Sequence, residues 1–224
     1  RLVDARHDAL NPRTEAREIP RGVISRFQAV IFVAFWSSVF VAVTSQISTL
    51  CLALSPAALA IAFWYSLAKR YTNYSQLFLG LAMAVAPVGG WLAAGGRAGW
   101  EPWLLGLAIG MWVGGFDVLY ACQDVDFDRN QGLRSIPVRY GVLNSLWISR
   151  GMHVVTIVML TALAAVTSLG LIYLFGVVVV AALLVYEQSL VRANDLSRIK
   201  QAFDLNGYVG ILYLATTAAA IYVG

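Results

Sequence analysis

Residues 103–128 read WLLGLAIGMWVGGFDVLYACQDVDFD. The first part, Trp103 to Phe116, is apolar and carries no charge, and four aspartates then follow within twelve positions: Asp117, Asp124, Asp126 and Asp128. On a helix, Asp124 and Asp128 share a face because they are four residues apart, and Asp117 lies two turns earlier on the same stripe. Asp126 points elsewhere. Carboxylates crowded at the end of an apolar helix repel one another, so they require solvent, cationic partners or a metal ion.

Composition places this stretch in a membrane protein. The sequence is 59% hydrophobic and 12% charged, whereas soluble domains average roughly 45–50% and about 25%. Apolar runs near twenty residues are long enough to span a bilayer as helices. We therefore predict an all-α fold, a polytopic transmembrane helical bundle with no separate soluble domain. The seven predicted spans cover residues 27–44, 47–66, 76–94, 102–122, 143–166, 170–187 and 205–223.

The charged residues favour one side of this bundle. If successive helices alternate in direction, residues 1–26, 67–75, 123–142 and 188–204 lie together, and all the basic residues but one lie on or next to that side. By the positive-inside rule, this side faces the cytoplasm. The acidic residues follow the same division, again with one exception. We therefore expect a cap of cytoplasmic loops that binds a charged substrate. The expected partner of the protein is the lipid bilayer, and we expect no nucleic acid partner.

A second aspartate pair precedes the first span. Asp4 and Asp8 are four residues apart, and Asn11-Pro12 ends the helix that would carry them. Mg²⁺ prefers oxygen ligands and is commonly held by one or two carboxylates together with substrate phosphates. Two such pairs on one side of the membrane therefore predict a diphosphate site bridged by Mg²⁺. The predicted metal ligands are Asp4, Asp8, Asp124 and Asp128.

Basic residues on the same side complete the prediction. Lys69 and Arg70 lie in the loop at 67–75 and Arg134 follows the second acidic motif; we expect them to neutralise the phosphates. Apolar surroundings suit a long hydrocarbon tail, so the inferred substrate is a prenyl diphosphate. Loss of the diphosphate leaves a cation-like allylic carbon, which the ring of Tyr120 can stabilise.

These motifs resemble those of the UbiA superfamily of intramembrane aromatic prenyltransferases, and the resemblance spans essentially the whole chain. The first family motif is similar to the Asp4–Asp8 pair with its following Asn-Pro-Arg-Thr and Arg-Glu-Ile-Pro strings. The second resembles Asp117-x-x-Tyr120-x-x-x-Asp124-x-x-x-Asp128 with Gly132-x-Arg134-Ser135, and residues 65–72 resemble the family's basic loop. The resemblance implies catalytic roles for Asp117, Tyr120 and Arg134, and diphosphate contacts from Arg17, Lys69, Arg70 and Arg134.

The resemblance also carries expectations about the chain's extent and acceptor. Family members have nine helices with the first motif after the second helix, so we expect residues 1–224 to be a single UbiA-like transmembrane domain that lacks the two N-terminal helices. The first motif's leading asparagine would then lie just before Arg1. The likeness is nearest to bacterial 4-hydroxybenzoate polyprenyltransferase-like enzymes of quinone biosynthesis, in the bacterial inner membrane. Another aromatic acid, on a menaquinone route, is the alternative acceptor.

Other protein classes fit less well. Membrane CDP-alcohol phosphotransferases also use aspartates and Mg²⁺ but need a compact Asp-Gly-x-x-Ala-Arg run, which the sequence lacks. A transporter, the distant alternative, would place ionisable groups near the middle of the bilayer, and here the acids gather at one edge.

Smaller features carry local expectations. We expect Ser25 to cap the first span and the mixed-charge loop at 188–204 to form a short surface helix. His153 should be a core histidine, and His7 should lie off the face of the two N-terminal aspartates. The two cysteines should be small packing residues without a disulfide.

Overall fold

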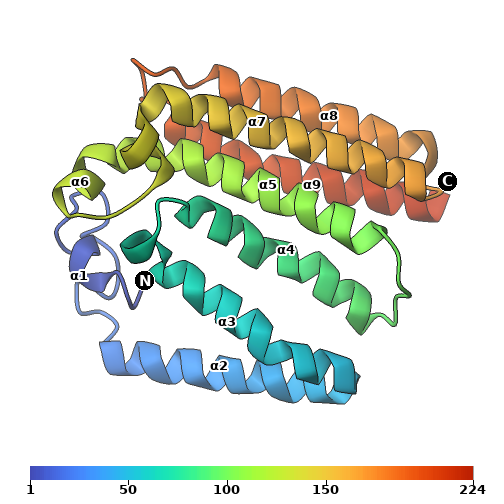
Figure 1. The fold of residues 1–224 in the computed structure, drawn as a ribbon, viewed down its shortest axis with the longest axis horizontal. Coiled ribbons are helices and arrows are strands. Elements are labelled where there is room, and N and C mark those ends of the chain that lie inside the picture. Colours follow the sequence, from blue (N-terminus) through green and yellow to red (C-terminus); the bar gives the residue numbers. More distant parts are fainter. Residues whose placement is uncertain (224) are drawn as a thin grey trace.

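The computed structural model describes residues 1–223, and these residues confirm the all-α bundle. Seven of the helices that they form are long and apolar enough to cross a membrane. Figure 1 shows the long helices side by side, with the short helices α1 and α6 gathered at one end and the C-terminus at the other. The elements are α1 (Ala5–Asp8), α2 (Arg26–Ile47), α3 (Thr49–Tyr71), α4 (Ser75–Ala93), α5 (Glu101–Ala121), the 3₁₀ turn η1 (Cys122–Asp124), α6 (Val125–Asn130), α7 (Ile136–Val166), α8 (Gly170–Ser189) and α9 (Ile199–Val223).

Each predicted span corresponds to one long helix, but three helices extend further toward the end that holds α1 and α6. α3 continues to Tyr71, α7 begins at Ile136 and α9 begins at Ile199. Hydropathy identifies only the apolar part of a helix, whereas backbone hydrogen bonding continues into the polar interface. The short helices α1 and α6 gather at this end (Figure 1), and a cytoplasmic cap of loops there stays a prediction.

The predicted surface helix in the loop at 188–204 is wrong. Within the described chain, Arg192 and Asp195 exchange backbone hydrogen bonds of 3.1 and 3.0 Å, which close a turn. The Asp195 carboxylate also accepts a hydrogen bond from the backbone N–H of Ser197 at 3.0 Å. Aspartate stabilises such turns because its short side chain competes with helical backbone bonds. The loop therefore connects α8 to α9 directly. The capping role of Ser25 is confirmed, since its hydroxyl accepts from the backbone N–H of Gln28.

Small residues bring α4 and α5 into close contact. A Cβ added at Gly80 would collide with the carbonyl oxygen of Gly110, and one at Gly106 would lie 3.2 Å from the carbonyl oxygen of Ala84. Gly106, Gly110 and Gly114 are four residues apart, so they form one stripe on α5 that faces α4. This close approach holds α5 against α4 just before the acidic motif.

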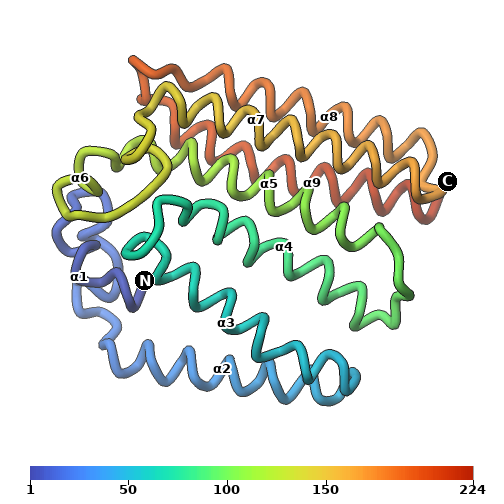
Figure 2. The backbone as a smooth tube through the Cα atoms, viewed as in Figure 1, coloured from blue at the N-terminus to red at the C-terminus, as the bar shows by residue number. Residues whose placement is uncertain are grey.

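The bundle is more tightly packed on one side than on the other. α5, α7, α8 and α9 bury a shared core that includes Tyr173, with its hydroxyl bonded to the carbonyl oxygen of Leu160 at 3.1 Å. Figure 2 shows α2 at one edge of the array, with α3 between it and α4. Only 6% of the α2 span is buried within the described residues, against 44% of the span that contains α5. The second acidic motif thus follows a helix that is much more deeply buried than α2.

Two glycines shape the chain after this motif. Gly132 adopts a positive φ of 68° at the end of α6, and the next N–H, of Leu133, returns to the carbonyl oxygen of Asp128 at 2.8 Å. The N–H of Arg134 then donates to the carbonyl oxygen of Lys69 at 2.8 Å, which joins this loop to the end of α3. Gly141, at φ 77°, breaks α7 near its start.

Candidate functional site

A cavity of about 230 Å³ lies at the end of the bundle that holds α1 and α6. Its wall comes mainly from the N-terminal segment, the end of α3, the last turns of α5 and the η1–α6 segment, with one residue each from the start of α4 and the loop after α6. Both acidic motifs contribute to it, so the structure brings together residues that are more than a hundred positions apart. The lining residues are Asp4, His7, Asp8, Asn11, Arg13, Thr14, Arg17, Tyr65, Lys69, Ser75, Asp117, Tyr120, Ala121, Asp124, Phe127, Asp128 and Leu133.

Three aspartates of the second motif face the same side, as predicted, but they do not lie on one continuous helix. Asp117 belongs to α5, Asp124 ends the 3₁₀ turn η1, and Asp128 belongs to α6. All three line the cavity, whereas the side chain of Asp126 is 96% exposed. The 3₁₀ turn redirects the chain, yet the four-residue spacing still keeps Asp124 and Asp128 on the inner side.

The first motif is built on a single helical turn. Asp4 precedes α1 and Asp8 ends it, and both line the cavity. Asn11 and Thr14 fold back beneath this turn: the Thr14 hydroxyl donates to the backbone carbonyl of Asp8 at 3.0 Å, and both side chains are buried. α1 ends at Asp8, before the Asn11-Pro12 end that the sequence predicts, and the N–H of Leu10 donates to the carbonyl oxygen of His7 at 3.0 Å in the turn that follows.

Each of the four predicted metal ligands has its own basic partner within residues 1–223. Arg70 pairs with Asp4 at 3.2 Å and Arg17 with Asp8 at 2.7 Å. Arg13 pairs with Asp124, and Lys69 pairs with Asp128 at 3.3 Å. Among these pairs Asp8, Asp124 and Asp128 are buried. Pairing with cations therefore makes the crowded carboxylates tolerable in the protein without ligand.

Arg13 connects the two motifs directly. Its Nε donates to Asp124 Oδ1 at 3.0 Å and its Nη2 to Asp124 Oδ2 at 2.5 Å, the two-pronged geometry that suits arginine and carboxylate. Its Nη1 also donates to the Tyr120 hydroxyl at 3.2 Å. Burial lowers the pKa of the Arg13 guanidinium, but the hydrogen bonds and charge of Asp124 more than offset this and leave that pKa above its ordinary value. Arg13 therefore remains a cation in the site.

The predicted phosphate-binding residues are divided by the structure. Lys69 and Arg17 line the cavity, and each forms an ion pair with an aspartate. Arg70 lies beside the cavity, where it holds Asp4 and the backbone carbonyl of Val3. Arg134 is exposed, does not line the cavity, and donates to the backbone carbonyl of Tyr71 at 2.8 Å. Its predicted contact with diphosphate would require the side chain to swing away from this bond.

Sequence reasoning missed several cavity residues. Arg13 and Asn11 belong to strings that carried the family resemblance, but they were not assigned to the site; the side-chain amide of Asn11 donates to Asp124 Oδ1 at 3.3 Å. Tyr65 reaches the cavity one turn before Lys69, a spacing that could have indicated it. The expectation for His7 is wrong, since His7 lines the same cavity. On a helix, His7 lies three residues after Asp4, so it borders the face of Asp4 and Asp8 instead of pointing away from it.

The carboxylate oxygens of the cavity offer ligands for Mg²⁺ but do not form a complete metal site by themselves. Asp8 Oδ2 is buried and accepts no hydrogen bond in the described chain, so it is free to bind a cation. Yet no group of three or more acidic, histidine or cysteine side chains within residues 1–223 converges closely enough to hold a metal alone. Because Mg²⁺ usually completes its shell with water and substrate phosphates, the residues fit an ion that arrives with a diphosphate.

Away from the cavity, the expectation of a core histidine is confirmed. His153 is buried in α7, and its Nδ1 lies 3.2 Å from the side-chain nitrogen of Gln188 on α8. The two cysteines, Cys51 and Cys122, are free thiols. Cys122 is buried in the core cluster with Leu119 and Leu146, whereas Cys51 is partly exposed, so its packing role stays a prediction.

Comparison with known proteins agrees with this geometry. The family model described as the UbiA prenyltransferase family matches residues 1–215. The chain is 34% identical over 212 residues to a 4-hydroxybenzoate octaprenyltransferase of Vibrio campbellii, covering 94% of this chain and 74% of the relative. It is 31% identical over 221 residues to the protein of the same name from Vibrio cholerae, with 98% and 77% covered.

Solved structures show the same architecture. The apo structure of a UbiA homologue from Aeropyrum pernix K1 superposes with a TM-score of 0.89 at 33% identity, covering 98% of this chain and 82% of that one. A UbiA homologue from Archaeoglobus fulgidus bound to DMAPP and Mg²⁺ superposes with a TM-score of 0.69; at 19% identity over 100% of this chain and 81% of that one, it supports the fold alone. The chain therefore belongs to the UbiA prenyltransferase family and is a multi-pass membrane prenyltransferase.

Proposed function

We propose that the protein transfers a polyprenyl group from a polyprenyl diphosphate to an aromatic acid, with 4-hydroxybenzoate as the acceptor in quinone biosynthesis. The observation that carries this proposal is one cavity in which two aspartate pairs meet Lys69, Arg17 and Arg13 beside apolar helices. The names of the Vibrio relatives support the acceptor.

The basic residues supply the binding chemistry. In the protein without substrate, Arg13, Arg17 and Lys69 each hold a carboxylate. A diphosphate offers them more negative charge than one carboxylate does, so we propose that they turn toward its oxygens when it binds. The aspartates released by this exchange, with Asp4, would then hold Mg²⁺. When bound, Mg²⁺ supplies positive charge that stabilises the departing diphosphate.

The remaining chemistry falls to two residues of α5. The carbon–oxygen bond of the prenyl diphosphate breaks, a carbon–carbon bond to the aromatic ring forms, and the ring loses a proton. Tyr120 lines the cavity with its hydroxyl toward Arg13, and we assign its ring to the allylic carbon. Among the cavity aspartates of residues 1–223, Asp117 alone has no ion pair. We therefore assign the ring proton to the Asp117 carboxylate.

A membrane assay tests the proposal. Membranes that contain the protein would receive labelled polyprenyl diphosphate, Mg²⁺ and a panel of aromatic acids, and EDTA would replace Mg²⁺ in parallel samples. We expect prenylated 4-hydroxybenzoate with Mg²⁺ and none with EDTA. A product with a different acid only would move the acceptor to another quinone route. No product with any aromatic acid would refute the proposed function.

We also propose that the cavity faces the cytoplasm of a bacterial inner membrane, from the concentration of basic residues at this end. A reporter inserted at Arg13 should then show cytoplasmic activity. Periplasmic activity of that reporter would overturn the orientation without affecting the chemistry.

A further inference from the structure

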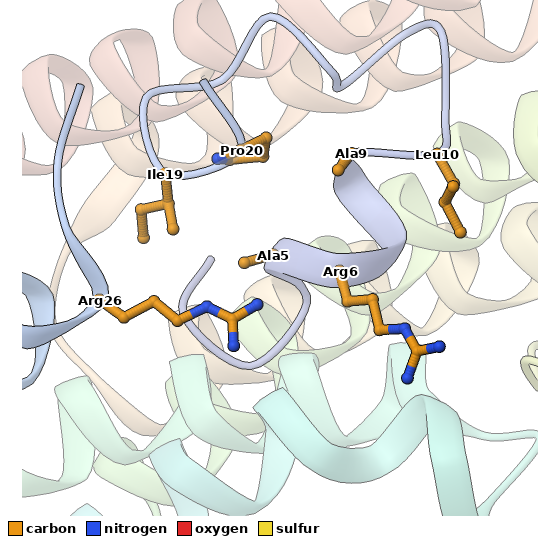
Figure 3. A pocket seen from close by; sticks show the side chains of 7 residues that line it. All are labelled: Ala5, Arg6, Ala9, Leu10, Ile19, Pro20 and Arg26. Atoms are coloured by element: carbon orange, nitrogen blue, oxygen red, sulfur yellow. The ribbon is translucent and has the colours of Figure 1, made fainter. Parts of the chain in front are cut away.

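A second pocket lies on the other side of the short helix α1 (Figure 3). Asp4 and Asp8 face the catalytic cavity, whereas Ala5, Arg6 and Ala9 line this pocket of about 410 Å³. Its remaining wall is formed by Leu10, Ile19, Pro20 and Arg26. The pocket is therefore separate from the diphosphate site and shares only the backbone of α1 with it.

The pocket has cationic charge without acidic partners. Five of its seven lining residues are apolar, and the other two are Arg6 and Arg26. Figure 3 shows both guanidinium groups along one side of the pocket, opposite Ile19, Pro20 and Ala9. Within residues 1–223, neither arginine forms an ion pair, in contrast to the four basic residues that hold the motif aspartates. This charge is available to an anion.

The pocket adjoins an apolar surface that belongs in the membrane. Arg26 is the first residue of α2, so the pocket meets that helix at its first turn. Next to it, Val23 is 68% exposed and Phe27 is 73% exposed, and Ile31 continues the exposed apolar surface one turn further along α2. An occupant that touches both parts needs an anionic group and, directly attached, a hydrocarbon region.

We propose that this pocket binds an anionic phospholipid, with the headgroup phosphate between Arg6 and Arg26 and the acyl chains along the start of α2. Basic pockets at the membrane interface bind such headgroups through charge and through the apolar stems of arginine. A free phosphate fits less well, because five apolar neighbours leave most of its oxygens without donors. The proposal stands independently of the acceptor and of the prenyl-transfer chemistry.

Native mass spectrometry of the detergent-solubilised protein tests this directly. The protein would be titrated with phosphatidylglycerol and, separately, with phosphatidylcholine, and the affinity of the first bound lipid would be compared. Each basic residue near an anionic headgroup contributes about 1 kcal/mol, or about fivefold in affinity. We therefore expect the variant with both Arg6→Gln and Arg26→Gln to lose about 25-fold in phosphatidylglycerol affinity, while phosphatidylcholine binding stays unchanged.

Matched controls separate this site from general charge. Arg21 is exposed on the same segment but does not line the pocket, so Arg21→Gln should leave phosphatidylglycerol affinity unchanged. The double variant should melt at the wild-type temperature in phosphatidylcholine vesicles, which shows that it is folded. Equal binding of the two lipids by the wild type, or full phosphatidylglycerol affinity in the double variant, would refute the proposal. Displacement of the lipid by inorganic phosphate would identify a free-anion site instead and would also refute it.

Discussion

The two aspartate pairs of the cavity stand on very different supports. Asp124 and Asp128 follow α5, which packs against α4, α7 and α9, and 44% of that span is buried. Asp4 and Asp8 stand on a segment whose regular structure, within the described residues, is one helical turn before α2. Its links to the bundle are mainly side-chain bonds: Arg70 to Asp4, and Arg13 and Asn11 to Asp124.

This difference implies two kinds of assembly in one site. Helix packing holds the second motif in place whether or not a ligand is bound, because tightly packed glycines fix α5. Charge pairs hold the first motif, and a bound diphosphate would compete for those same cations. We call the side that carries Asp124 and Asp128 the firm wall, because helix packing holds it. The side that carries Asp4 and Asp8 is the adjustable wall, because charge pairs hold it. The predictions below test each wall in turn.

The largest effect is expected from the firm wall. Asp124→Ala or Asp128→Ala should lower kcat/KM for prenyl transfer by about 10²–10³-fold, because each removes a proposed ligand of the Mg²⁺ that stabilises the departing diphosphate. The measurement is Mg²⁺-dependent turnover in membranes. Asp126→Ala is the matched control, since that side chain is 96% exposed and should retain activity. Normal turnover in both cavity variants would remove the metal assignment.

A substitution in the helix contact tests what keeps that wall firm. Gly80→Ala places a methyl group against the Gly110 backbone, and we expect a loss of about 1–3 kcal/mol of stability through overpacking. The apparent melting temperature in detergent should fall. Gly89→Ala, on the same helix with open space around it, should not lower it. If both variants melt alike, the close approach of α4 and α5 does not stabilise the bundle.

Two of the basic residues predicted to contact the diphosphate, Lys69 and Arg134, should differ in their effect on substrate binding. Lys69→Gln should raise KM for polyprenyl diphosphate about tenfold, the equivalent of roughly 1.4 kcal/mol for a lost charge-assisted contact. Arg134→Gln should raise it less, because Arg134 is exposed and bonded to the Tyr71 backbone. Steady-state kinetics at saturating acceptor measure both. A larger effect at Arg134 would show that its side chain moves into the cavity with substrate.

The smallest effect is expected at the adjustable wall. Arg13→Ala removes the bonds of the Arg13 side chain to Asp124 and Tyr120 and leaves only the Asn11 bond to Asp124, so the segment should open more often. The Arg13 side chain is 33% exposed, which limits the pair to about 1 kcal/mol, or about fivefold in opening. Cleavage by a glutamate-specific protease at Glu15 and Glu18 reports that opening. The Arg21→Ala variant, as the control, should be cleaved at the wild-type rate. If the Arg13→Ala variant is also cleaved at the wild-type rate, other contacts hold the segment.

The local spacing of residues was a good guide to the site, and the partners of those residues were not. Four-residue spacing correctly placed Asp124 and Asp128 on one face, because that relation depends only on the geometry of a helix. It could not show the 3₁₀ turn before α6. Arg134 was assigned to the cavity because it follows the motif closely, but Gly132 turns the chain so that Arg134 lies outside.

The amino-acid sequence by itself determined the class of the protein, its seven membrane-length helices and the gathering of charge at one end. These follow from hydrophobicity and length, which act along the chain and need no partner. Only the tertiary structure decided which cation meets which carboxylate, that Arg13 joins the two motifs, and that α1 separates an acidic cavity from a basic pocket. Such pairings depend on distances between elements far apart in the chain, and those distances are set by how the helices pack.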